Sequence, residues 1–341
     1  MADGAGTEGA IWHGGDLATA KALFHDAPEP WIDLSTGINP FPYPLPALPL
    51  SLWQRLPGGR EEAALLAAAG RAYGMLPASA IVAAPGTQIL IELLPRLAPQ
   101  ARVAVLGPTY GEHELAWRKA GCEVREIADL AEAGAADVVV VVNPNNPDGH
   151  IVDLPALTAV ADSLAARGGL LVIDEAFADF QPGASLVPTL PQATLVLRSF
   201  GKAYGLAGVR LGFAIGEGRH VEALRGMLGP WAVAGPALEI GTQALGDAGW
   251  LAAQEKARAA DARRLDALLA KSGRVVGGTI LYRLLETSAA PALFERLGRA
   301  GIYVRRFRHD PSRLRFGLPG DEPGWGRLET VLGAEGDRRW S

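Results

Sequence analysis

The chain between residues 80 and 216 alternates short apolar runs with stretches that repeat apolar residues at helical spacing. The five valines from Val138 to Val142 are apolar on both faces, as a strand covered by helices requires. The predicted strands are Ile81–Ala84, Arg102–Leu106, Asp137–Val142, Leu170–Ile173, Thr194–Leu197 and Leu211–Ile215. The predicted helices are Thr87–Leu97, Gly111–Ala120 and Leu154–Arg167. This alternation predicts a mostly parallel, helix-covered sheet with its functional site at the carboxyl ends of the strands.

Two flanking regions depart from this alternation. Proline excludes Asn39–Pro49 from regular helix and from a central strand, yet its surroundings are too apolar for a disordered leader. We therefore expect an ordered arm that crosses a surface or a partner subunit. After Glu217, long Ala/Leu/Arg helices precede short strands around Leu281–Leu285, Tyr303–Phe307 and Leu314–Leu318. The prediction is an α/β protein with an N-terminal arm (1–45), a large domain (46–230) and a smaller α+β C-terminal domain (231–341).

Composition narrows the possible functions. A net charge of −5 over 341 residues argues against nucleic-acid binding, which needs a basic surplus or stripe. The single cysteine, Cys122, excludes an intrachain disulfide and a thiolate-rich metal site, and we expect no metal centre. No apolar run approaches the roughly 20 residues of a membrane helix, and the N-terminus does not resemble a signal peptide. We expect a soluble protein of the cytoplasm with no membrane partner.

Lys202 has a different setting from the other lysines, Lys21, Lys119, Lys256 and Lys271. It follows an apolar strand and lies among Phe, Tyr, Leu and Gly residues. Such a lysine loses part of its hydration, which makes its amine a usable nucleophile toward an aldehyde. On this context alone, a solvated surface lysine remains an alternative.

Further polar groups follow other predicted strands. Asp174 ends a buried strand, where an unpaired carboxylate is costly; a protonated ring nitrogen is a natural partner, and helix capping is the alternative. Asn146 lies in an Asn- and Pro-rich turn, a common signal by itself. The segment from Gly86 to Gln88 opens a helix and offers backbone N–H groups to a phosphate, to which Ser199 and Arg210 can add donors. The combination is more specific than any single motif.

Together these motifs resemble those of the fold-type I aminotransferase family, whose members depend on pyridoxal 5′-phosphate (PLP). The resemblance covers nearly the whole chain and implies an enzyme with PLP as its cofactor. A regulator that senses PLP without turnover is an alternative of another class, although the chain carries no DNA-binding appendage. A nucleotide-binding α/β protein is a further alternative, but the chain lacks a dinucleotide fingerprint and a P-loop.

The resemblance also implies a role for each residue of the site. Lys202 would bond covalently to the cofactor, Asp174 would pair with the ring nitrogen, and Arg315 would bind the substrate α-carboxylate. For Arg315, a surface charge on an edge strand is the alternative. The remaining cofactor contacts would come from Gly86, Thr87, Gln88, Ser199 and Arg210 at the phosphate, Tyr110 on the ring face and Asn146 at the ring 3′-oxygen, where Asn146 also adjoins the substrate.

Two branches of the family share these motifs: histidinol-phosphate aminotransferases and the threonine-phosphate decarboxylases of cobalamin biosynthesis. The segments His13–Asp16 and Asp33–Pro40 are more similar to the decarboxylases, as is Phe177, where most aminotransferases have Tyr. We therefore expect decarboxylation of L-threonine O-3-phosphate to (R)-1-aminopropan-2-yl phosphate, with an aminotransferase acting on histidinol phosphate or a related amino acid as the alternative. Three departures from the family pattern put the phosphate contacts in doubt: Leu56 for Tyr, Asp148 for Thr, and Gly201 for Ser or Thr.

The two branches differ in which Cα bond stands perpendicular to the cofactor ring. Both use the same cofactor residues, so placement of the carboxylate and of the distal phosphate decides the outcome. His13 is our candidate for the distal phosphate, with a structural or solvated histidine as the alternative. The apolar residues around Asn39–Pro49 further predict a homodimer with the cofactor near the subunit boundary.

Overall fold

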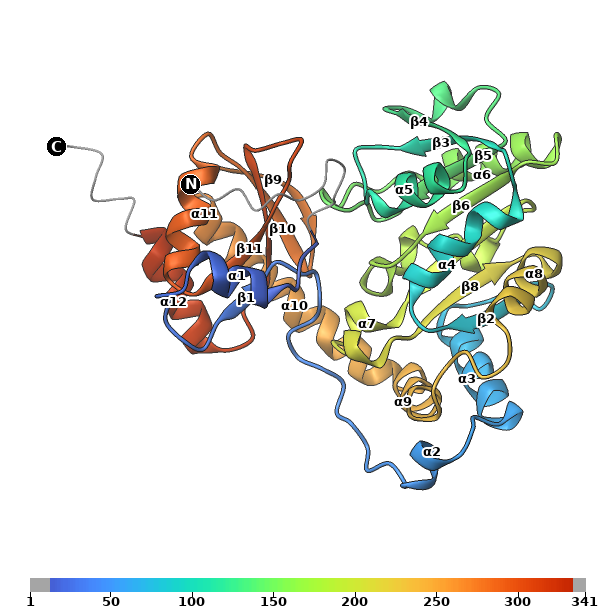
Figure 1. Ribbon diagram of the computed structural model, residues 1–341, viewed down its shortest axis with the longest axis horizontal. Coiled ribbons are helices and arrows are strands. Elements are labelled where there is room, and N and C mark those ends of the chain that lie inside the picture. The colour runs from blue at the N-terminus through green and yellow to red at the C-terminus, as the bar shows by residue number, and fades with distance from the viewer. Residues whose placement is uncertain (1–12, 334–341) are drawn as a thin grey trace. The chain divides into compact units, whose positions relative to one another are not determined.

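The computed structural model describes residues 13–333, which group into two compact units (Figure 1). Residues 13–40 and 258–333 form the small unit, and residues 41–257 form the large unit. These boundaries differ from the predicted ones after residues 45 and 230. The large unit extends beyond residue 230 because α9 (Gly235–Gly246) packs along α3 (Gly59–Ala72), where Gly241 lets Leu65 approach closely.

A seven-stranded sheet forms the centre of the large unit, in the order β2-β8-β7-β6-β5-β3-β4. Its strands are β2 (Ala80–Ala84), β3 (Arg102–Leu106), β4 (Glu123–Ile127), β5 (Val138–Val142), β6 (Leu170–Asp174), β7 (Thr194–Ser199) and β8 (Gly212–Gly216). All neighbouring pairs are parallel except those that β8 makes with β2 and β7. Because β8 runs the opposite way, its first residues lie at the edge where the other strands end.

Helices cover this sheet (Figure 1). Besides α3 and α9, the large unit contains the helices α2 (Ser51–Gln54), α4 (Thr87–Leu93), α5 (Glu112–Lys119), α6 (Leu154–Ala165), α7 (Phe200–Ala203) and α8 (Gly218–Leu228). One hydrophobic cluster joins Ile91 of α4, Trp117 of α5 and Leu224 of α8 to alternate strand residues such as Val140. The buried residues of α6 lie outside that cluster, and α6 contacts β6. Coverage on both faces explains why β5 is apolar throughout and β6 is apolar up to its last residue, Asp174.

Short 3-10 helices connect several of these elements in the large unit. The 3-10 helices are η1 (Leu94–Leu97), η2 (Leu130–Ala133), η3 (Ala178–Phe180), η4 (Pro182–Ala184), η5 (Val187–Thr189) and η6 (Ala207–Val209). The predicted helix Thr87–Leu97 is α4 followed by η1, because Pro95 has no N–H to continue α-helical bonding. A longer helix, α10 (Ala248–Leu269), begins in the large unit and ends in the small one.

The small unit has a five-stranded sheet in the order β1-β11-β12-β10-β9. Its elements are α1 (Leu17–Leu23), β1 (Ile32–Leu34), β9 (Arg274–Thr279), β10 (Tyr282–Glu286), α11 (Ala290–Arg299), β11 (Ile302–Arg306), β12 (Arg313–Gly317) and α12 (Glu322–Gly333). Only β1 pairs in parallel, with β11, so part of the predicted N-terminal arm is an edge strand of this sheet. Leu314 and Phe316 point into a core with Leu293, Leu297 and Leu328.

The predicted α/β architecture with a second, smaller α+β unit is confirmed. The predicted strands are all present, with ends displaced by one or two residues. β1, β4 and β9 were not predicted: β1 is three residues long, β4 alternates charged residues, and β9 contains Gly277 and Gly278. Among residues 13–333, no helix combines the length and hydropathy needed to cross a bilayer.

Candidate active site

Lys202 lies in α7, directly after β7 ends at Ser199. Its side chain is partly exposed, while its neighbours Gly201 and Ala203 are buried. The Lys202 Nζ lies 5.7 Å from the centroid of the Phe177 ring, so Phe177 forms one wall beside the amine. The Phe200 ring stacks on Tyr204 at 4.5 Å, which packs the two ends of this lysine-bearing turn together.

Asp174 ends β6 and is held by two hydrogen bonds. The backbone N–H of Ala176 donates to its Oδ1 at 3.0 Å, and its Oδ2 lies 2.9 Å from Nε2 of His113. Both side chains are buried. His113 was missed from the sequence; the available signal was its place one helical turn after Tyr110, whose ring meets the His113 ring edge-on at 6.3 Å. A buried carboxylate fixed in this way has a defined orientation, as a partner for a ring N–H requires.

Polar atoms crowd around Gly86, where a positive φ of 88° precedes the first turn of α4. A Cβ at Gly86 would overlap the guanidinium of Arg210, and a Cβ at Gly212 would meet the Thr87 backbone nitrogen at 2.7 Å. The antiparallel direction of β8 thus brings Arg210 against the first residues of α4. Glycine keeps a guanidinium and backbone N–H groups side by side, which is the donor set that a phosphate requires.

The asparagines of the turn after β5 differ in their surroundings: some are buried or bonded within the turn, and one is partly exposed. Asn143 is buried and donates to Ala184 O at 3.1 Å, whereas Asn145 donates to Asp148 Oδ1 at 2.8 Å. Asp148 also accepts from the His150 N–H at 3.0 Å, so the residue that replaces the family's Thr holds this turn together. Asn146, the predicted cofactor contact, lies in the same turn and is partly exposed.

Tyr110 and Gln88 contact each other at this edge of the sheet. The Tyr110 hydroxyl donates to Gln88 Oε1 at 3.2 Å, and Gln88 Nε2 donates to Glu112 Oε2 at 3.1 Å. The carboxylate of Glu112 can only accept, so it fixes which end of the Gln88 amide faces Tyr110. The sequence did not indicate Glu112, a buried acid at the start of α5.

Packing explains why glycine stands at position 201, where the family often has Ser or Thr. A Cβ there would meet the Ala207 Cα at 2.7 Å, so the backbone after Lys202 folds back where Ser or Thr would not fit without a shift. Leu56, the second departure, has an exposed side chain just beyond α2.

Arg315 is in the small unit, on the face of β12 opposite Leu314 and Phe316. It is buried, donates to Ser35 O at 3.0 Å, and lies 4.8 Å from the centroid of the Tyr282 ring. The alternative of a surface charge is therefore wrong. Arg305 of β11 is paired directly with Arg315, which places both side chains on one face of the sheet. Sequence reasoning missed Arg305, because the pairing register was not known.

The predicted residue His13 belongs to the same unit. Its neighbour Gly15 donates a backbone N–H to Ser35 Oγ at 2.8 Å, and Gly14 is packed so closely on the Ser35 carbonyl that a Cβ would overlap it. His13 itself is exposed. The structure thus brings the segment of His13 and the guanidinium of Arg315 to one residue, Ser35.

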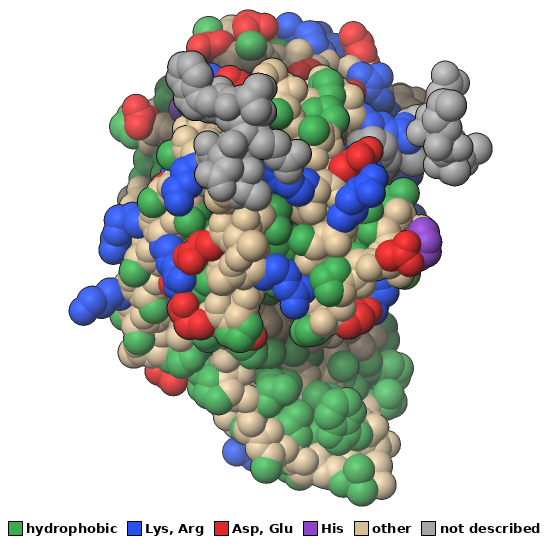
Figure 2. All heavy atoms as spheres, turned by 90° about the vertical axis from the view of Figure 1, so that its left-hand side faces the viewer, with side chains coloured by type: hydrophobic (Ala, Val, Ile, Leu, Met, Phe, Trp, Pro, Cys, Tyr) green, Lys and Arg blue, Asp and Glu red, His purple; other side chains and the backbone are tan. Residues whose placement is uncertain are grey.

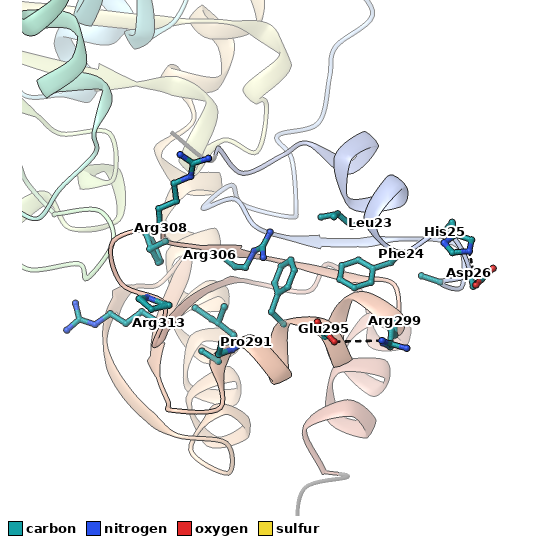
Figure 3. Close-up of a pocket in the computed structure, with 16 residues that line it drawn as sticks. Leu23, Phe24, His25, Asp26, Pro291, Glu295, Arg299, Arg306, Arg308 and Arg313 are labelled. Carbon is teal, nitrogen blue, oxygen red and sulfur yellow. Dashed lines mark ion pairs between the residues drawn. The ribbon is translucent and has the colours of Figure 1, made fainter. Parts of the chain in front are cut away.

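A separate pocket of about 810 Å³ lies in the small unit, between α1, α11 and the β11–β12 connection (Figure 3). Figure 3 shows Phe24 beside it, Arg299 paired with Glu295, and Arg306 and Arg308 at the other end. None of the predicted site residues lines it. Among residues 13–333, no His, Cys, Asp and Glu cluster could hold a metal ion.

The family model for "Aminotransferase class I and II" matches residues 56–330. The chain belongs to this family. The match covers most of both units, including Lys202, Asp174 and Arg315, so the resemblance drawn from the motifs is confirmed.

Curated relatives of this aminotransferase-family chain divide into two groups. Proteins named "Threonine-phosphate decarboxylase" from Pseudomonas aeruginosa and a Sinorhizobium species are 43% and 44% identical; each match covers 94% of this chain and 96% or 97% of the relative. A "Histidinol-phosphate aminotransferase" from Shewanella oneidensis is 31% identical over 72% of this chain and 68% of the relative. The chain is thus more similar, and over a greater length, to these two decarboxylases than to this aminotransferase.

Solved structures support the same fold. A histidinol-phosphate aminotransferase from Sinorhizobium meliloti, in complex with pyridoxal 5′-phosphate, superposes with a TM-score of 0.80 at 21% identity, covering 96% of each chain. In the present chain, Asp174, Lys202 and the Gly86–Arg210 pocket provide a carboxylate, an amine and a phosphate cradle on one sheet edge. The carboxylate fits the ring nitrogen of that cofactor, the amine fits its aldehyde, and the cradle fits its phosphate.

Proposed function

We propose that this chain is a PLP-dependent lyase that decarboxylates L-threonine O-3-phosphate. The Cα–carboxylate bond breaks, CO₂ leaves, and a proton takes its place on Cα to give (R)-1-aminopropan-2-yl phosphate. The likeness to two threonine-phosphate decarboxylases over 94% of the chain carries this proposal. The polar sheet edge supports it, because its donors suit the cofactor that such chemistry uses.

PLP supplies an electron sink for the pair released at Cα when it is bound. The chain's own residues hold the groups that make this possible. Asp174 would keep a proton on the ring nitrogen through charge pairing, and His113 fixes that carboxylate at 2.9 Å. Asn146 would donate to the ring 3′-oxygen, and Tyr110 would cover the ring face.

The cradle around Gly86 would hold the phosphate of the cofactor. Arg210 would supply the charge, the Thr87 and Gln88 backbone N–H groups would supply directional donors, and Ser199 would supply a hydroxyl. Lys202 would hold the cofactor covalently, and its Nζ is the proposed donor of the proton that replaces CO₂ at Cα.

The substrate carries two anionic groups, a carboxylate and a distal phosphate. Arg315 binds the α-carboxylate with a planar, bidentate donor set. Arg305, its cross-strand neighbour, and His13, whose segment contacts Ser35, are the candidates for the phosphate. Anchoring both ends would restrict rotation at Cα and so favour loss of the carboxylate over loss of the Cα proton.

Transamination of histidinol phosphate or a related amino acid is the second candidate function. The observation that favours it is the 31% identity to a histidinol-phosphate aminotransferase, together with cofactor residues that both reactions use. Lys202 would then remove the Cα proton instead of delivering one.

The two functions are separated by incubating the purified protein with PLP and each substrate. We expect L-threonine O-3-phosphate to give the phosphorylated amine, identified by mass spectrometry and NMR, without 2-oxoglutarate. Histidinol phosphate with 2-oxoglutarate should give no glutamate. Glutamate formation from histidinol phosphate, with threonine phosphate unreacted, would reverse the assignment.

The homodimer also remains a proposal, which exposed apolar side chains of the large unit support. Leu45, Leu50, Trp53 and Leu56 are each more than 60% exposed, and Trp231 is 60% exposed. In Figure 2, hydrophobic side chains gather on the lower part of the face shown, at the height of α2 in Figure 1. An apolar surface of this kind suits a self-complementary interface with a second copy.

Sedimentation analysis tests this surface. Trp53→Asp should shift the protein from dimer to monomer, because a charge at the interface would be desolvated without a partner. Leu76→Asp, an exposed apolar residue elsewhere on the large unit, is the matched control and should remain dimeric. A fully active monomer of the unmodified protein would contradict the proposal.

A place in cobalamin biosynthesis follows from the product, which supplies the aminopropanol phosphate that links the nucleotide loop. The single cysteine, Cys122, is buried and free, which suits a reducing compartment, so we propose a cytoplasmic location. Growth of a deletion strain without added cobalamin or aminopropanol phosphate would contradict the pathway assignment.

A further inference from the structure

Three charged side chains that the proposed reaction does not use are buried beneath the sheet edge. The guanidinium of Arg198 lies 2.8 Å from Glu175 Oε2 and 2.7 Å from Asp179 Oδ1, and all three side chains are at most 5% exposed. The Tyr73 ring lies 4.3 Å from the guanidinium carbon and closes another side of the group. We call Arg198, Glu175 and Asp179 the buried ion triad.

The triad joins the two segments that carry Asp174 and Lys202. Glu175 directly follows Asp174, and Arg198 directly precedes Ser199 at the end of β7. Backbone pairing between β6 and β7 ends at Asp174 and Leu197, followed by the bond from the Glu175 N–H to Leu197 O at 2.9 Å. The last two residues of β7, Arg198 and Ser199, pair with β8 and not with β6, so the ion triad continues the connection between the two segments where the β6–β7 ladder has ended.

Glu175 also holds the chain that follows Asp174. Ser185 Oγ donates to Glu175 Oε2 at 2.6 Å, and the Leu186 N–H donates to Oε1 at 2.8 Å. With Asp179 fixed by Arg198, the segment from Glu175 to Leu186 is fastened at several points. That segment includes Phe177, the wall beside Lys202.

Burying the three charged side chains of the triad costs desolvation free energy. Burial raises the pKa of Glu175 and of Asp179, and the charge of Arg198 opposes that rise. Burial alone would lower the pKa of Arg198, but the carboxylates of Asp179 and Glu175 raise it and keep the guanidinium charged. Replacing such a buried group by apolar residues is often neutral or stabilising, so its presence is weak support for a role in stability alone.

We propose that the buried ion triad is a positioning device that sets the distance between Asp174 and Lys202. This inference rests on the proposed function only in that PLP contacts both residues. Asp174 would pair with the ring nitrogen and Lys202 with the aldehyde, which lie on opposite sides of one rigid ring. Arg198, whose guanidinium is paired with Glu175 and Asp179, would fix the two segments that hold that ring.

The experiment uses variants that keep the protein folded while removing the rigid connection. Arg198→Lys keeps the charge but loses the planar fork that reaches both carboxylates. The triple variant Arg198→Met/Glu175→Gln/Asp179→Leu removes all three charges and leaves a side-chain oxygen for Ser185 and Leu186. Glu175→Gln alone is the mildest change. Arg102→Met/Asp137→Asn, which removes an exposed ion pair at the other end of the sheet, is the matched control.

Each variant is measured for folding without cofactor, for PLP affinity, and for the pH midpoint of its visible absorbance. We expect variants that melt like the unmodified apoprotein to bind PLP more weakly by roughly ten- to a hundredfold, the range seen when an outer partner is removed from a metal site. The absorbance midpoint and kcat should change, with little change in the KM for the substrate. The control should match the unmodified protein in PLP affinity, absorbance midpoint and kcat, with only the slight loss of melting temperature expected from an exposed ion pair.

Two results would count against a positioning role for the buried ion triad. A folded variant of the triad with unmodified PLP affinity and absorbance midpoint would overturn the inference and leave the triad as packing. If all triad variants melt far below the apoprotein, positioning is again overturned, because stability then accounts for the group. Failure of the unmodified protein to bind PLP would instead refute the proposed function.

Discussion

In the large unit, the cofactor residues stand at the ends of several strands of one sheet, whereas in the small unit the substrate residues stand on two paired strands and beside Ser35. The first arrangement follows from strand direction: parallel strands bring Asp174, Ser199 and Asn146 to one edge, and the reversed β8 adds Arg210. The second depends on register and on the segment of His13. In our proposal the residues of the large unit therefore hold the cofactor, and those of the small unit select the substrate.

The strongest test of the large unit is removal of its nucleophile. Lys202→Ala should abolish turnover and the visible absorbance of the lysine-bound cofactor, because no other lysine of the described chain lies at this sheet edge. Absorbance spectra before and after borohydride treatment report the covalent bond. If the Ala variant still shows a chromophore that borohydride reduces, another residue carries the cofactor.

Asp174→Asn comes next in expected size. The amide fills the same space and PLP still binds, but it cannot hold the ring proton by charge pairing, so turnover should fall by several orders of magnitude. Steady-state kinetics with titrated PLP separate the loss of turnover from any loss of binding. Near-normal turnover would remove Asp174 from its role.

Arg315→Lys probes the small unit by replacing a bidentate donor with a point charge. We expect kcat/KM for L-threonine O-3-phosphate to fall by roughly 10²-fold, the scale of a lost charge-assisted hydrogen bond, with PLP affinity unchanged. Isothermal titration of PLP and initial-rate kinetics measure the two quantities. A large loss of PLP affinity would mean that Arg315 acts on the cofactor, contrary to the comparison drawn above.

His13→Ala should have a smaller effect, because Arg305 shares the proposed phosphate contact. Substrate affinity should fall by roughly tenfold with PLP affinity unchanged, and the share of abortive transamination should rise as Cα becomes freer to rotate. Competition binding and pyridoxamine phosphate formation provide the readings. Unchanged affinity would exclude His13 while leaving the decarboxylase assignment intact.

The smallest predicted effect lies at the opposite end of the large sheet from its site. Hydrogen bonds from Arg102 lower the pKa of Asp137 to about 2, below its ordinary value of 3.8. The resulting stability is present above pH 3.8 and is lost as the pH falls toward 2. Asp137→Asn should therefore lower the melting temperature slightly at neutral pH and not at pH 2, because the pair is largely exposed. An equal loss at both pH values would contradict this.

The sequence was sufficient to predict candidate site residues that lie at the ends of strands. Lys202, Asp174 and Gly86 could be predicted because each follows an apolar run, and parallel strands end at one edge. Contacts between distant positions were not accessible in this way. His113 and Asp174 are 61 positions apart, and nothing in either local sequence indicates that they meet.

The small unit was harder to predict for a related reason. The face shared by Arg305 and Arg315 depends on the β11–β12 register, which the apolar pattern of short strands does not specify. The polar strand β4 was missed because an edge strand can carry charged residues on both faces, as Glu123, Arg125 and Glu126 do. The partners of Arg198 were hidden because buried ion pairs have no sequence periodicity.

The central claim is that this family member breaks the Cα–carboxylate bond. The most direct measurement is the yield of labelled CO₂ from L-threonine O-3-phosphate with a ¹³C carboxylate, compared with the pyridoxamine phosphate formed by the same enzyme. The account predicts one CO₂ for each substrate molecule consumed and only traces of pyridoxamine phosphate. Substrate consumption with label retained in a keto acid, and pyridoxamine phosphate formed in step with it, would contradict the account.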